Sequence, residues 1–389
     1  MGHFCTASGS SLNALSPRDS QGAFAQRAEP RYSSPVDNHK MDDRFMRMAI
    51  REAQKGEGQT SPNPMVGALL VAGNRVLSRG YHQCFGGPHA EVRCLAGVRA
   101  SLPAGATLYV TLEPCSTVGK TGRCTDAIIR AGVSRVVVGA VDPNPAHKGR
   151  GLEALERAGI VVRSGVLESA CREMNEAFNK WIVSRRPFVI AKCGMSLDGR
   201  LTQRPGNGRW ITSGAARRDA QKLRAKADAI IVGAETIRRD DPRLTVRGVK
   251  NANQPWRVIL TRSGKLPATS RVFRDRGKDR THVYRNKSLR AVLADLGKKN
   301  IVCAVIEGGG DILGQALDGG LIDKVQIYLG PMFTGGPVIA FAGRGASSTQ
   351  AATQLQCTSY KRIGNDLRVI GYLGSELQER ANKFRNFTS

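Results

Sequence analysis

Apolar residues recur along the first part of the chain with two spacings, one typical of helices and one typical of strands. A spacing near 3.6 predicts a helix over about residues 42–55, with Phe45, Met48 and Ala49 on one face. Alternating and continuous apolar runs predict further elements. These are strands at 67–71, 76–81, 107–112, 135–141 and 160–162, and helices from about His89, at 124–131 and at 152–158. Such alternation of helices and strands predicts a layered α/β domain.

A second α/β series follows the Arg185-Arg186-Pro187 sequence, which ends a predicted helix over 168–183. Its expected strands are 188–193, 229–232, 257–261, 301–306 and 324–329, and its expected helices are 214–226, 289–296 and one from near Asp311. We therefore expect one domain over residues 41–183 and another over 187–375, with a tail at 376–389.

Residues 1–40 are polar and rich in Ser and Pro, and they contain no apolar core of a signal peptide. They are expected to be a disordered extension or the result of an upstream start site. A transit peptide is the less favoured alternative because Asp19, Glu29 and Asp37 lie in this segment.

The composition, with 41% hydrophobic residues, is typical of a soluble globular protein. No apolar run reaches the roughly 18 residues of a membrane span. The nine cysteines are odd in number and scattered, which argues against a disulfide framework and for a reducing cytoplasm.

The net charge of +27 is unevenly distributed, since residues 185–300 contain 29 Lys and Arg against 9 Asp and Glu. Such a basic domain can bind nucleic acid or small phosphorylated molecules. Aromatic residues make up only 5% of the chain and do not alternate with basic ones. The composition therefore favours an anionic small-molecule site and no specific nucleic acid.

Candidate metal ligands lie in three short segments: His89-Ala90-Glu91, Pro114-Cys115 and Cys124. One imidazole and two thiolates form a suitable ligand set for Zn²⁺ that leaves a fourth position for water. Glu91 would then be the catalytic acid/base rather than a ligand, as in zinc deaminases. The alternative is a partly buried histidine with two unrelated cysteines, and the ordered motifs favour zinc over it.

The spacing of the cysteines separates deaminase classes, because eight residues lie between Cys115 and Cys124 where most nucleoside and nucleic-acid deaminases have two. This spacing occurs together with the segments Asn63–Gly67, Gly80–His82 and Asp142–Pro145. On these motifs the chain resembles the bifunctional diaminohydroxyphosphoribosylaminopyrimidine deaminase / 5-amino-6-(5-phosphoribosylamino)uracil reductase family, from about residue 42 to residue 372.

The resemblance implies a cytidine-deaminase-like three-layer domain whose substrate contacts are Asn63, His82, Ser116, Lys120, Asp142 and Asn144. Lys120 is expected to meet the ribose phosphate of a phosphorylated pyrimidine. Taken alone, His82 could equally be an ordinary histidine at a strand end. The zinc loop departs from the family at Thr117 and at Gly122-Arg123, while the metal ligands are intact.

Two features of the second half suggest a ligand-binding site even when the family resemblance is set aside. Glu307-Gly308-Gly309-Gly310 lies between an apolar strand and a helix, where backbone N–H groups can meet a phosphate. Polar residues also gather at predicted strand ends, at Lys192, at Trp210–Ser213 and at Asp240–Arg247. Turn and cap chemistry is the alternative explanation of that second group.

The same resemblance implies a dihydrofolate-reductase-like α/β domain that uses NADPH. The implied cofactor contacts are Gly194, Trp210, Thr236, Asp240, Gly308, Gly309 and Gly310, and the implied substrate contacts are Lys192, Gly208, Arg224, Leu244, Arg247 and Glu307. Arg224 and Arg247 suit a phosphate because a guanidinium donates two parallel hydrogen bonds. Lys192 and Asp240 are both candidates to handle the proton, and Arg262 could meet the 2′-phosphate.

The resemblance therefore implies a riboflavin biosynthesis enzyme that is both hydrolase and oxidoreductase. It would deaminate 2,5-diamino-6-(5-phosphoribosylamino)pyrimidin-4-one in a zinc-dependent reaction. It would then reduce the ribosyl side chain with NADPH to give 5-amino-6-(5-phosphoribitylamino)uracil. The alternatives are an RNA deaminase with a basic RNA-binding domain and a monofunctional member of the family. The family also suggests a homodimer formed through the reductase domains.

Overall fold

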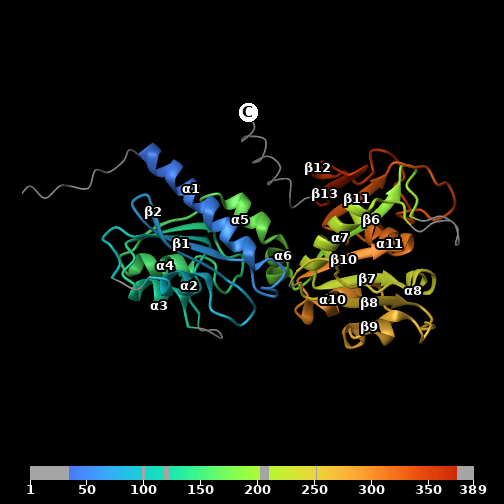
Figure 1. Cartoon of the computed structure of the whole chain (residues 1–389), viewed down its shortest axis with the longest axis horizontal. Helices are drawn as coiled ribbons and strands as arrows, with labels where there is room; N and C mark the ends of the chain where they lie inside the picture. Colours follow the sequence, from blue (N-terminus) through green and yellow to red (C-terminus); the bar gives the residue numbers. More distant parts are fainter. Residues whose placement is uncertain (1–34, 99–100, 118–121, 202–209, 251, 375–389) are drawn as a thin grey trace, which may run out of the picture.

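The computed structural model describes residues 35–98, 101–117, 122–201, 210–250 and 252–374. These residues form two α/β domains that lie side by side, each built on its own β-sheet (Figure 1). The layered α/β class predicted for both halves is confirmed. Among the described residues, no helix combines the length and the apolar character that crossing a membrane requires.

The first sheet has five strands in the order β2-β1-β3-β4-β5. Strand β1 pairs antiparallel with β2 and β3, whereas β3, β4 and β5 are parallel. The strands are β1 (Gly67–Ala72), β2 (Arg75–Tyr81), β3 (Thr107–Leu112), β4 (Arg135–Ala140) and β5 (Val161–Arg163). The parallel strands bring the ends of β3 and β4 to one edge, where the polar segments after each strand meet.

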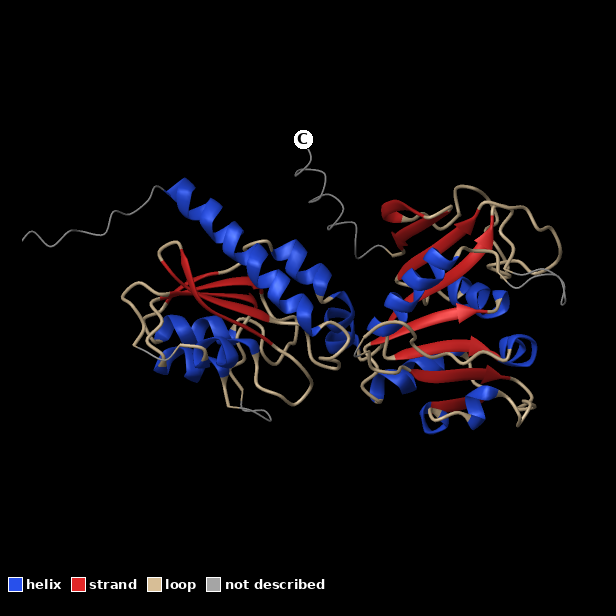
Figure 2. Cartoon of the chain, in the orientation of Figure 1, coloured by secondary structure: helices blue, strands red, loops and turns tan. Residues whose placement is uncertain are grey.

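Helices cover both faces of this sheet and make the first domain three layers thick (Figure 2). Helices α1 (Pro35–Ala53) and α5 (Glu168–Met174) pack on one face, with Phe45, Met46 and Cys171 in the core. Helices α2 (Ala90–Ala96), α3 (Cys124–Arg130) and α4 (Arg150–Arg157) pack on the other face. The short helix η1 (Gln54–Gly56) continues α1.

Two helical predictions in this domain need correction. Helix α1 begins at Pro35, so residues 35–40, which the sequence assigned to the extension, belong to the helix. The helix predicted over 168–183 is two helices, α5 and α6 (Glu176–Ser184), which meet at Asn175. The buried Asn175 side chain accepts from the Met65 backbone N–H and donates to the Met65 carbonyl, each at 2.8 Å. The break therefore provides both hydrogen bonds for the Met65 backbone.

The second sheet has eight strands in the order β12-β13-β11-β6-β10-β7-β8-β9. The six from β11 to β9 are parallel, and the hairpin of β12 and β13 adds antiparallel to β11. The strands are β6 (Phe188–Ser196), β7 (Ala229–Gly233), β8 (Trp256–Thr261), β9 (Thr281–Arg285), β10 (Cys303–Gly308), β11 (Lys324–Gly330), β12 (Gln356–Ile363) and β13 (Asp366–Tyr372).

Both faces of the second sheet are covered. Helices α10 (Leu289–Lys298) and α11 (Gly310–Asp318) pack against the core that contains Val189, Ile231 and Ile306. The opposite face has α7 (Gly214–Lys226) over Ile190 and Val305, and α8 (Ala234–Asp240) with α9 (Arg271–Arg274) over Ile230 and Ile259. The short helix η2 (Lys278–Arg280) leads into β9.

Several elements of the second domain differ from prediction. Strand β10 starts two residues later than expected and includes Glu307 and Gly308, and α11 begins at Gly310 rather than near Asp311. Helices α8 and α9 and strands β9, β12 and β13 were not predicted. The edge strand β12 has six exposed residues between two half-buried ones, so it lacks the apolar signal by which strands are predicted.

The two domains contact each other through the loop after η1 and through α6. Lys226 at the end of α7 forms an ion pair with Glu57, at 2.7 Å, and the Asn253 side chain donates to the Gly58 carbonyl at 3.0 Å. On α6, the Trp181 ring N–H donates to the Gly297 carbonyl at 2.9 Å. Helix α6 therefore packs against the second sheet although its sequence was assigned to the first domain.

Candidate active sites

The three predicted metal ligands meet at the carboxyl end of β3. His89 is the residue before α2, Cys115 follows β3 by three residues, and Cys124 is the first residue of α3. The Nδ1 atom of His89 lies 3.2 Å from Sγ of Cys124 and 3.5 Å from Sγ of Cys115. The three ligand atoms all lie within 4.8 Å of one another, which fits the ligand distances of a single tetrahedral zinc ion.

The two thiols of this group influence each other strongly. Interaction with the Cys124 thiol, together with His89 and the Cys124 backbone N–H, lowers the pKa of Cys115 to about 4. The same contact and burial raise the pKa of Cys124. One sulfur of the pair thus carries the negative charge, and a thiolate is the form of cysteine that binds zinc.

Glu91 lies in the first turn of α2, two residues after His89, and its side chain is buried with 3% of its surface exposed. Burial raises the pKa of its carboxyl to about 7. A carboxyl that ionises near neutral pH can both accept and release a proton during turnover. Its position beside the ligands, and not among them, agrees with the predicted acid/base role.

Asn63 and His82 lie next to the metal ligands and contact each other. The Nδ2 atom of Asn63 is 3.1 Å from Nε2 of His82, while Nδ1 of His82 is 3.2 Å from the Pro88 carbonyl. Because a carbonyl can only accept, Nδ1 carries the proton and Nε2 accepts from Asn63. Burial, with the charges of His89 and Arg93, lowers the pKa of His82, which favours this neutral form.

A buried carboxylate holds the loop after β4 beside the zinc ligands. Glu113, two residues before Cys115, accepts from the backbone N–H groups of Asp142, Gly149 and Gly151 at 3.1, 3.0 and 2.8 Å. This brings the predicted residues Asp142 and Asn144 to the same edge as Ser116, and burial raises the pKa of Asp142. Lys120 lies outside the described residues.

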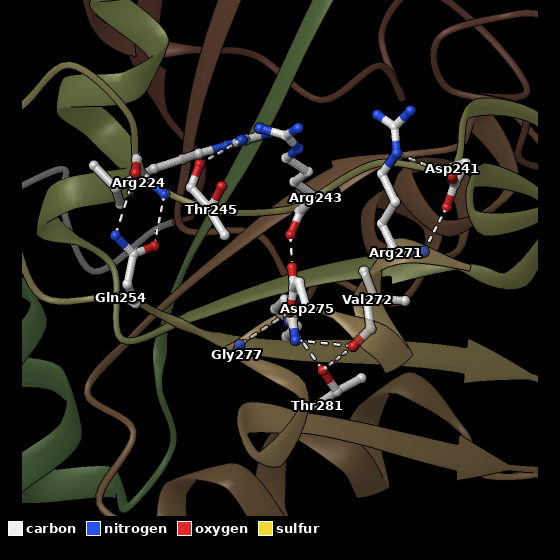
Figure 3. A network of polar contacts seen from close by, with 12 residues as sticks. Arg224, Asp241, Arg243, Thr245, Gln254, Arg271, Val272, Asp275, Gly277 and Thr281 are labelled. Carbon is white, nitrogen blue, oxygen red and sulfur yellow. Dashed lines mark hydrogen bonds and ion pairs between the residues drawn. The ribbon is translucent and has the colours of Figure 1, made fainter. Parts of the chain in front are cut away.

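The second domain contains a buried ion pair on the α7 face of its sheet. Arg224 donates to Glu307 through Nε at 2.7 Å and Nη2 at 2.6 Å, and its Nη1 donates to the Thr245 carbonyl at 3.0 Å. Figure 3 shows Arg224 beside Thr245. Burial alone would raise the pKa of Glu307, but the charges of Arg224, Lys192 and Arg247 lower it to about 2.

This pair bears on the role expected for Arg224, which stays a prediction. The Nε and Nη2 groups hold Glu307 and Nη1 donates to Thr245, so the edge that holds Glu307 is not open to a phosphate. Lys192 lies next to Glu307, because β6 pairs with β10 in a register that sets Ala191 opposite Ile306. Leu244 has a left-handed backbone, with φ 51°, and its side chain is 3% exposed within the core.

Arg247 is exposed, and its backbone N–H donates to the Gln221 side chain of α7 at 2.9 Å. It therefore lies on the same side of the sheet as the ion pair. Gly208 lies outside the described residues. The loop from Asp241 to Arg247 is further fixed by Arg271, which pairs with Asp241 at 3.2 Å (Figure 3).

The predicted cofactor residues gather at the carboxyl ends of β7 and β10. A Cβ placed on Gly309 would lie 3.8 Å from Oγ1 of Thr236, so the starts of α8 and α11 are adjacent. A Cβ on Gly310 would lie 2.0 Å from the Ile339 carbonyl oxygen, so only glycine fits there. Gly309 precedes α11, whose first N–H groups can bind a phosphate.

The remaining cofactor candidates lie on other elements of the second domain. Gly194 lies in β6, where a Cβ would be 3.1 Å from the Thr212 side chain. The exposed Trp210 ring lies under the Arg217 guanidinium, 4.4 Å from its centroid. Asp240 ends α8, and Arg262 is exposed just after β8.

Two features of these sites were not predicted from the sequence. Glu113 was not identified because its role depends on three backbone groups 29 to 38 residues away. His147 was also not identified, because its contact with Thr117 joins residues 30 positions apart in the sequence. Its ring Nδ1 lies 3.5 Å from the Thr117 hydroxyl. The Asp142–Pro145 motif was the only sequence signal for that loop.

Comparison with known proteins identifies both domains. Residues 39–140 match the family model of the cytidine and deoxycytidylate deaminase zinc-binding region, and residues 187–369 match that of the RibD C-terminal domain. The chain is 37% identical over 352 residues to a riboflavin biosynthesis protein RibD of Aquifex aeolicus, covering 85% of this chain and 98% of that protein. The Escherichia coli RibD is 36% identical over 367 residues, covering 85% and 99%.

Solved structures agree over both domains. RibD of Acinetobacter baumannii has a TM-score of 0.80 at 33% identity, covering 87% of this chain and 100% of that one. A Thermotoga maritima diaminohydroxyphosphoribosylaminopyrimidine deaminase/5-amino-6-(5-phosphoribosylamino)uracil reductase has a TM-score of 0.79 at 34% identity, with the same coverages.

The fold and the two sites define a zinc-dependent deaminase joined to an NADPH-dependent reductase in one chain. Within this class, the chain belongs to the RibD family of riboflavin biosynthesis proteins. It is thus a bifunctional enzyme, a hydrolase in its first domain and an oxidoreductase in its second. An RNA deaminase is not favoured by these relationships.

Proposed function

We propose that the first domain deaminates 2,5-diamino-6-(5-phosphoribosylamino)pyrimidin-4-one and that the second reduces the product with NADPH to the ribityl compound. The observation that supports this most directly is the convergence of His89, Cys115 and Cys124 beside the buried Glu91, in a chain that also carries the reductase fold. The Thermotoga relative is named for both of these activities.

In the deaminase, His89, Cys115 and Cys124 would hold the zinc ion, which would supply a nucleophile at neutral pH by lowering the pKa of a water. Glu91 would take the proton of that water and deliver it to the departing amine, because its pKa of about 7 allows both transfers. The Nδ2 atom of Asn63 is engaged by His82, so Oδ1 is its available acceptor for a substrate amino group.

His82 would act indirectly by keeping Asn63 in one orientation. Ser116, Asp142 and Asn144 would line the substrate pocket, with Lys120 reaching the phosphate. The hydrogen bonds that Glu113 accepts from the loop after β4 support this assignment for Asp142 and Asn144. They fix this loop at the strand edge next to Cys115.

In the reductase, NADPH supplies the hydride, and the protein orients substrate and cofactor. The pyrophosphate would lie on the Gly308–Gly310 segment and Thr236, with Gly194, Trp210 and Asp240 around it. Glu307, held by Arg224, would accept from the substrate, and Arg247 would bind its phosphate. Lys192 is favoured over Asp240 for handling the proton, because Lys192 adjoins Glu307 while Asp240 lies at the exposed end of α8.

We also propose that the protein is a cytoplasmic homodimer formed through its reductase domains. Phe333, Met332 and Leu197 expose 78%, 37% and 52% of their surfaces, and the Leu197 N–H donates to the Met332 carbonyl, so these side chains are neighbours. Exposed apolar side chains grouped in this way are typical of a protein–protein interface. The described cysteines form no disulfide, which is compatible with a reducing compartment.

The decisive experiment incubates the purified chain with the diaminopyrimidine phosphate, with and without NADPH. We expect ammonia release in both samples, and NADPH oxidation only after deamination. Ammonia release without NADPH oxidation would restrict the protein to the deaminase step. If neither occurs and a cytidine or adenosine in RNA is deaminated instead, the proposal is wrong. Size-exclusion chromatography with light scattering tests the dimer.

A further inference from the structure

His147 lies on the loop between β4 and α4, and its ring approaches the segment that follows the predicted zinc ligand Cys115. Its ring Nδ1 is 3.5 Å from the hydroxyl of Thr117, two residues after the ligand Cys115. The imidazole is half-buried, while Thr117 is exposed. These two side chains therefore connect the loop after β3 to the loop after β4, at positions 30 residues apart in the sequence.

The position of His147 is fixed by the backbone of its loop. Its N–H donates to the Asn144 carbonyl at 2.9 Å, and its own carbonyl accepts from Arg150 N–H at 2.8 Å. Asn144 is held in turn, because its N–H donates to the Asp142 side chain at 2.9 Å and its side chain accepts from Ala146 N–H at 3.1 Å. The loop is thus a set of closed turns that presents the imidazole in one direction.

The buried carboxylate of Glu113 joins this loop to the metal site. It accepts N–H groups from both ends of the loop, at Asp142 and at Gly149 and Gly151, and it lies two residues before Cys115. The segment that carries His147 is consequently anchored to the strand that carries a zinc ligand. A rim built in this way can contribute to substrate binding with little loss of conformational entropy.

The charges at this rim favour an anion. Lys148 and Arg150 follow His147 in the same loop, Arg123 precedes the ligand Cys124, and all three are exposed. The sequence His147-Lys148-Gly149-Arg150 contains no acidic residue. Two carboxylates contact this loop, and both are engaged by backbone N–H groups: Asp142 accepts from Asn144 and Glu113 accepts from Gly149. A phosphate group at the rim would therefore meet donors and positive charge.

We infer that His147 is a specificity residue of the deaminase, which together with Thr117 donates hydrogen bonds to the phosphate of the ribosylaminopyrimidine substrate. This inference rests on the proposed function and extends it from the reacting amine to the far end of the substrate. An imidazole N–H and a threonine hydroxyl can each donate a hydrogen bond to a phosphate oxygen. The contribution of His147 is to discriminate phosphorylated from unphosphorylated substrate, with no role in the chemical step.

The test compares the full-length wild type with His147→Ala on the phosphorylated substrate and on its dephosphorylated nucleoside. For the phosphorylated substrate we expect KM to rise by about 10- to 100-fold with kcat nearly unchanged, the effect of losing a charge-assisted hydrogen bond. For the nucleoside, kcat/KM should be the same in both proteins. His147→Asn, which keeps a donor near the position of Nδ1, should recover part of the loss.

Zinc content and NADPH oxidation on deaminated substrate should be unaffected in both variants, which establishes that they are folded. Arg157→Ala, which removes an exposed charge from α4, is the matched control and should behave as wild type. An equal loss on both substrates would assign His147 to loop structure, and no loss on either would also overturn the inference. Failure of the wild type to deaminate the phosphorylated substrate would instead overturn the proposed function.

Discussion

Arg224 and Glu307 join α7 to β10 through two parallel hydrogen bonds of 2.7 and 2.6 Å, with side chains only 13% and 6% exposed. A buried pair of this kind has a large desolvation cost that its internal hydrogen bonds offset. Removing either partner leaves the other charged and unpaired. The pair therefore holds α7 and β10 together beside the predicted reductase site. Lys192 and Arg247 lie close enough for their charges to lower the pKa of Glu307.

This pair predicts the acid sensitivity of the second domain. The pKa of Glu307 is lowered from 4.5 to about 2, so its contribution to stability is full above pH 4.5 and is lost as the pH falls toward 2. Relative to Glu307→Gln, the wild type should lose about 2 to 3 kcal/mol of unfolding free energy between about pH 6 and pH 2.5. Urea unfolding followed by tryptophan fluorescence measures this, since Trp210 and Trp256 lie in that domain. Identical pH profiles for the two proteins would contradict it.

The zinc site predicts a selective loss on removal of one thiolate. Cys124→Ala should lose bound zinc and ammonia release while NADPH oxidation on pre-deaminated substrate persists, because the ligand lies in a different domain from the reductase site. Metal analysis and the two separate assays check this. Cys84→Ala, which removes an exposed thiol, should keep one zinc per chain. Full zinc content in the Cys124 variant would exclude this residue as a ligand.

Glu91→Gln should separate metal binding from proton transfer. The amide has nearly the same shape as the carboxyl and Glu91 is not among the three ligands, so zinc content should be unchanged. Loss of a general acid/base costs about 10²- to 10⁴-fold in kcat. Ammonia release by a variant of confirmed zinc content provides the measurement. Activity within a few-fold of wild type would assign the proton transfers to another group.

Gly309 and Gly310 form a matched pair of substitution sites at the predicted cofactor loop. Gly310→Ala would place a Cβ 2.0 Å from the Ile339 carbonyl oxygen, so the loop must move, whereas the nearest atom to a Cβ on Gly309 is 3.8 Å away. We expect Gly310→Ala to lose NADPH binding at least tenfold more than Gly309→Ala does, with deamination intact in both. Fluorescence titration with NADPH tests this, and equal affinities in the two variants would contradict it.

Much of the deaminase site is predictable because its residues lie in short motifs at the ends of regular elements. His89, Glu91, Cys115 and Cys124 take their positions from local strand and helix boundaries, which hydrophobic periodicity locates. The reductase site is less predictable. Arg224 and Glu307 are 83 residues apart, and the sequence indicates what each can bind but not that they bind each other.

The elements that the sequence failed to predict are those whose structure is determined by neighbouring parts of the fold. Asn175 interrupts an otherwise helical pattern because the Met65 backbone needs its amide. Strand β12 is exposed and polar, and it is a strand because β13 offers it a pairing edge. Neither cause is visible in local propensity, which tertiary contacts commonly override.

Arg247 remains the candidate for the substrate phosphate in the reductase, since Arg224 is engaged by Glu307. Arg247→Ala should weaken substrate binding by about 1.5–3 kcal/mol, the usual loss for a charge-assisted hydrogen bond, and leave NADPH affinity nearly unchanged. Arg276→Ala, at another exposed arginine of this domain, serves as the control. Binding of RNA should be weak and fall steeply with salt. Tight, sequence-selective RNA binding at physiological salt would contradict this account of the basic charge.

The contact at Gly58 bears on how such two-domain enzymes can be recombined. Gly58 has φ 74°, and a Cβ there would lie 2.5 Å from the Ala225 carbonyl oxygen at the end of α7. Its neighbour Glu57 pairs with Lys226 across the same seam. Because of these contacts, neither domain can be exchanged for that of a relative without regard to the interface between them. A chimera that joins this deaminase to another reductase must preserve a glycine on one side and a close-fitting helix end on the other, or its halves will be held apart.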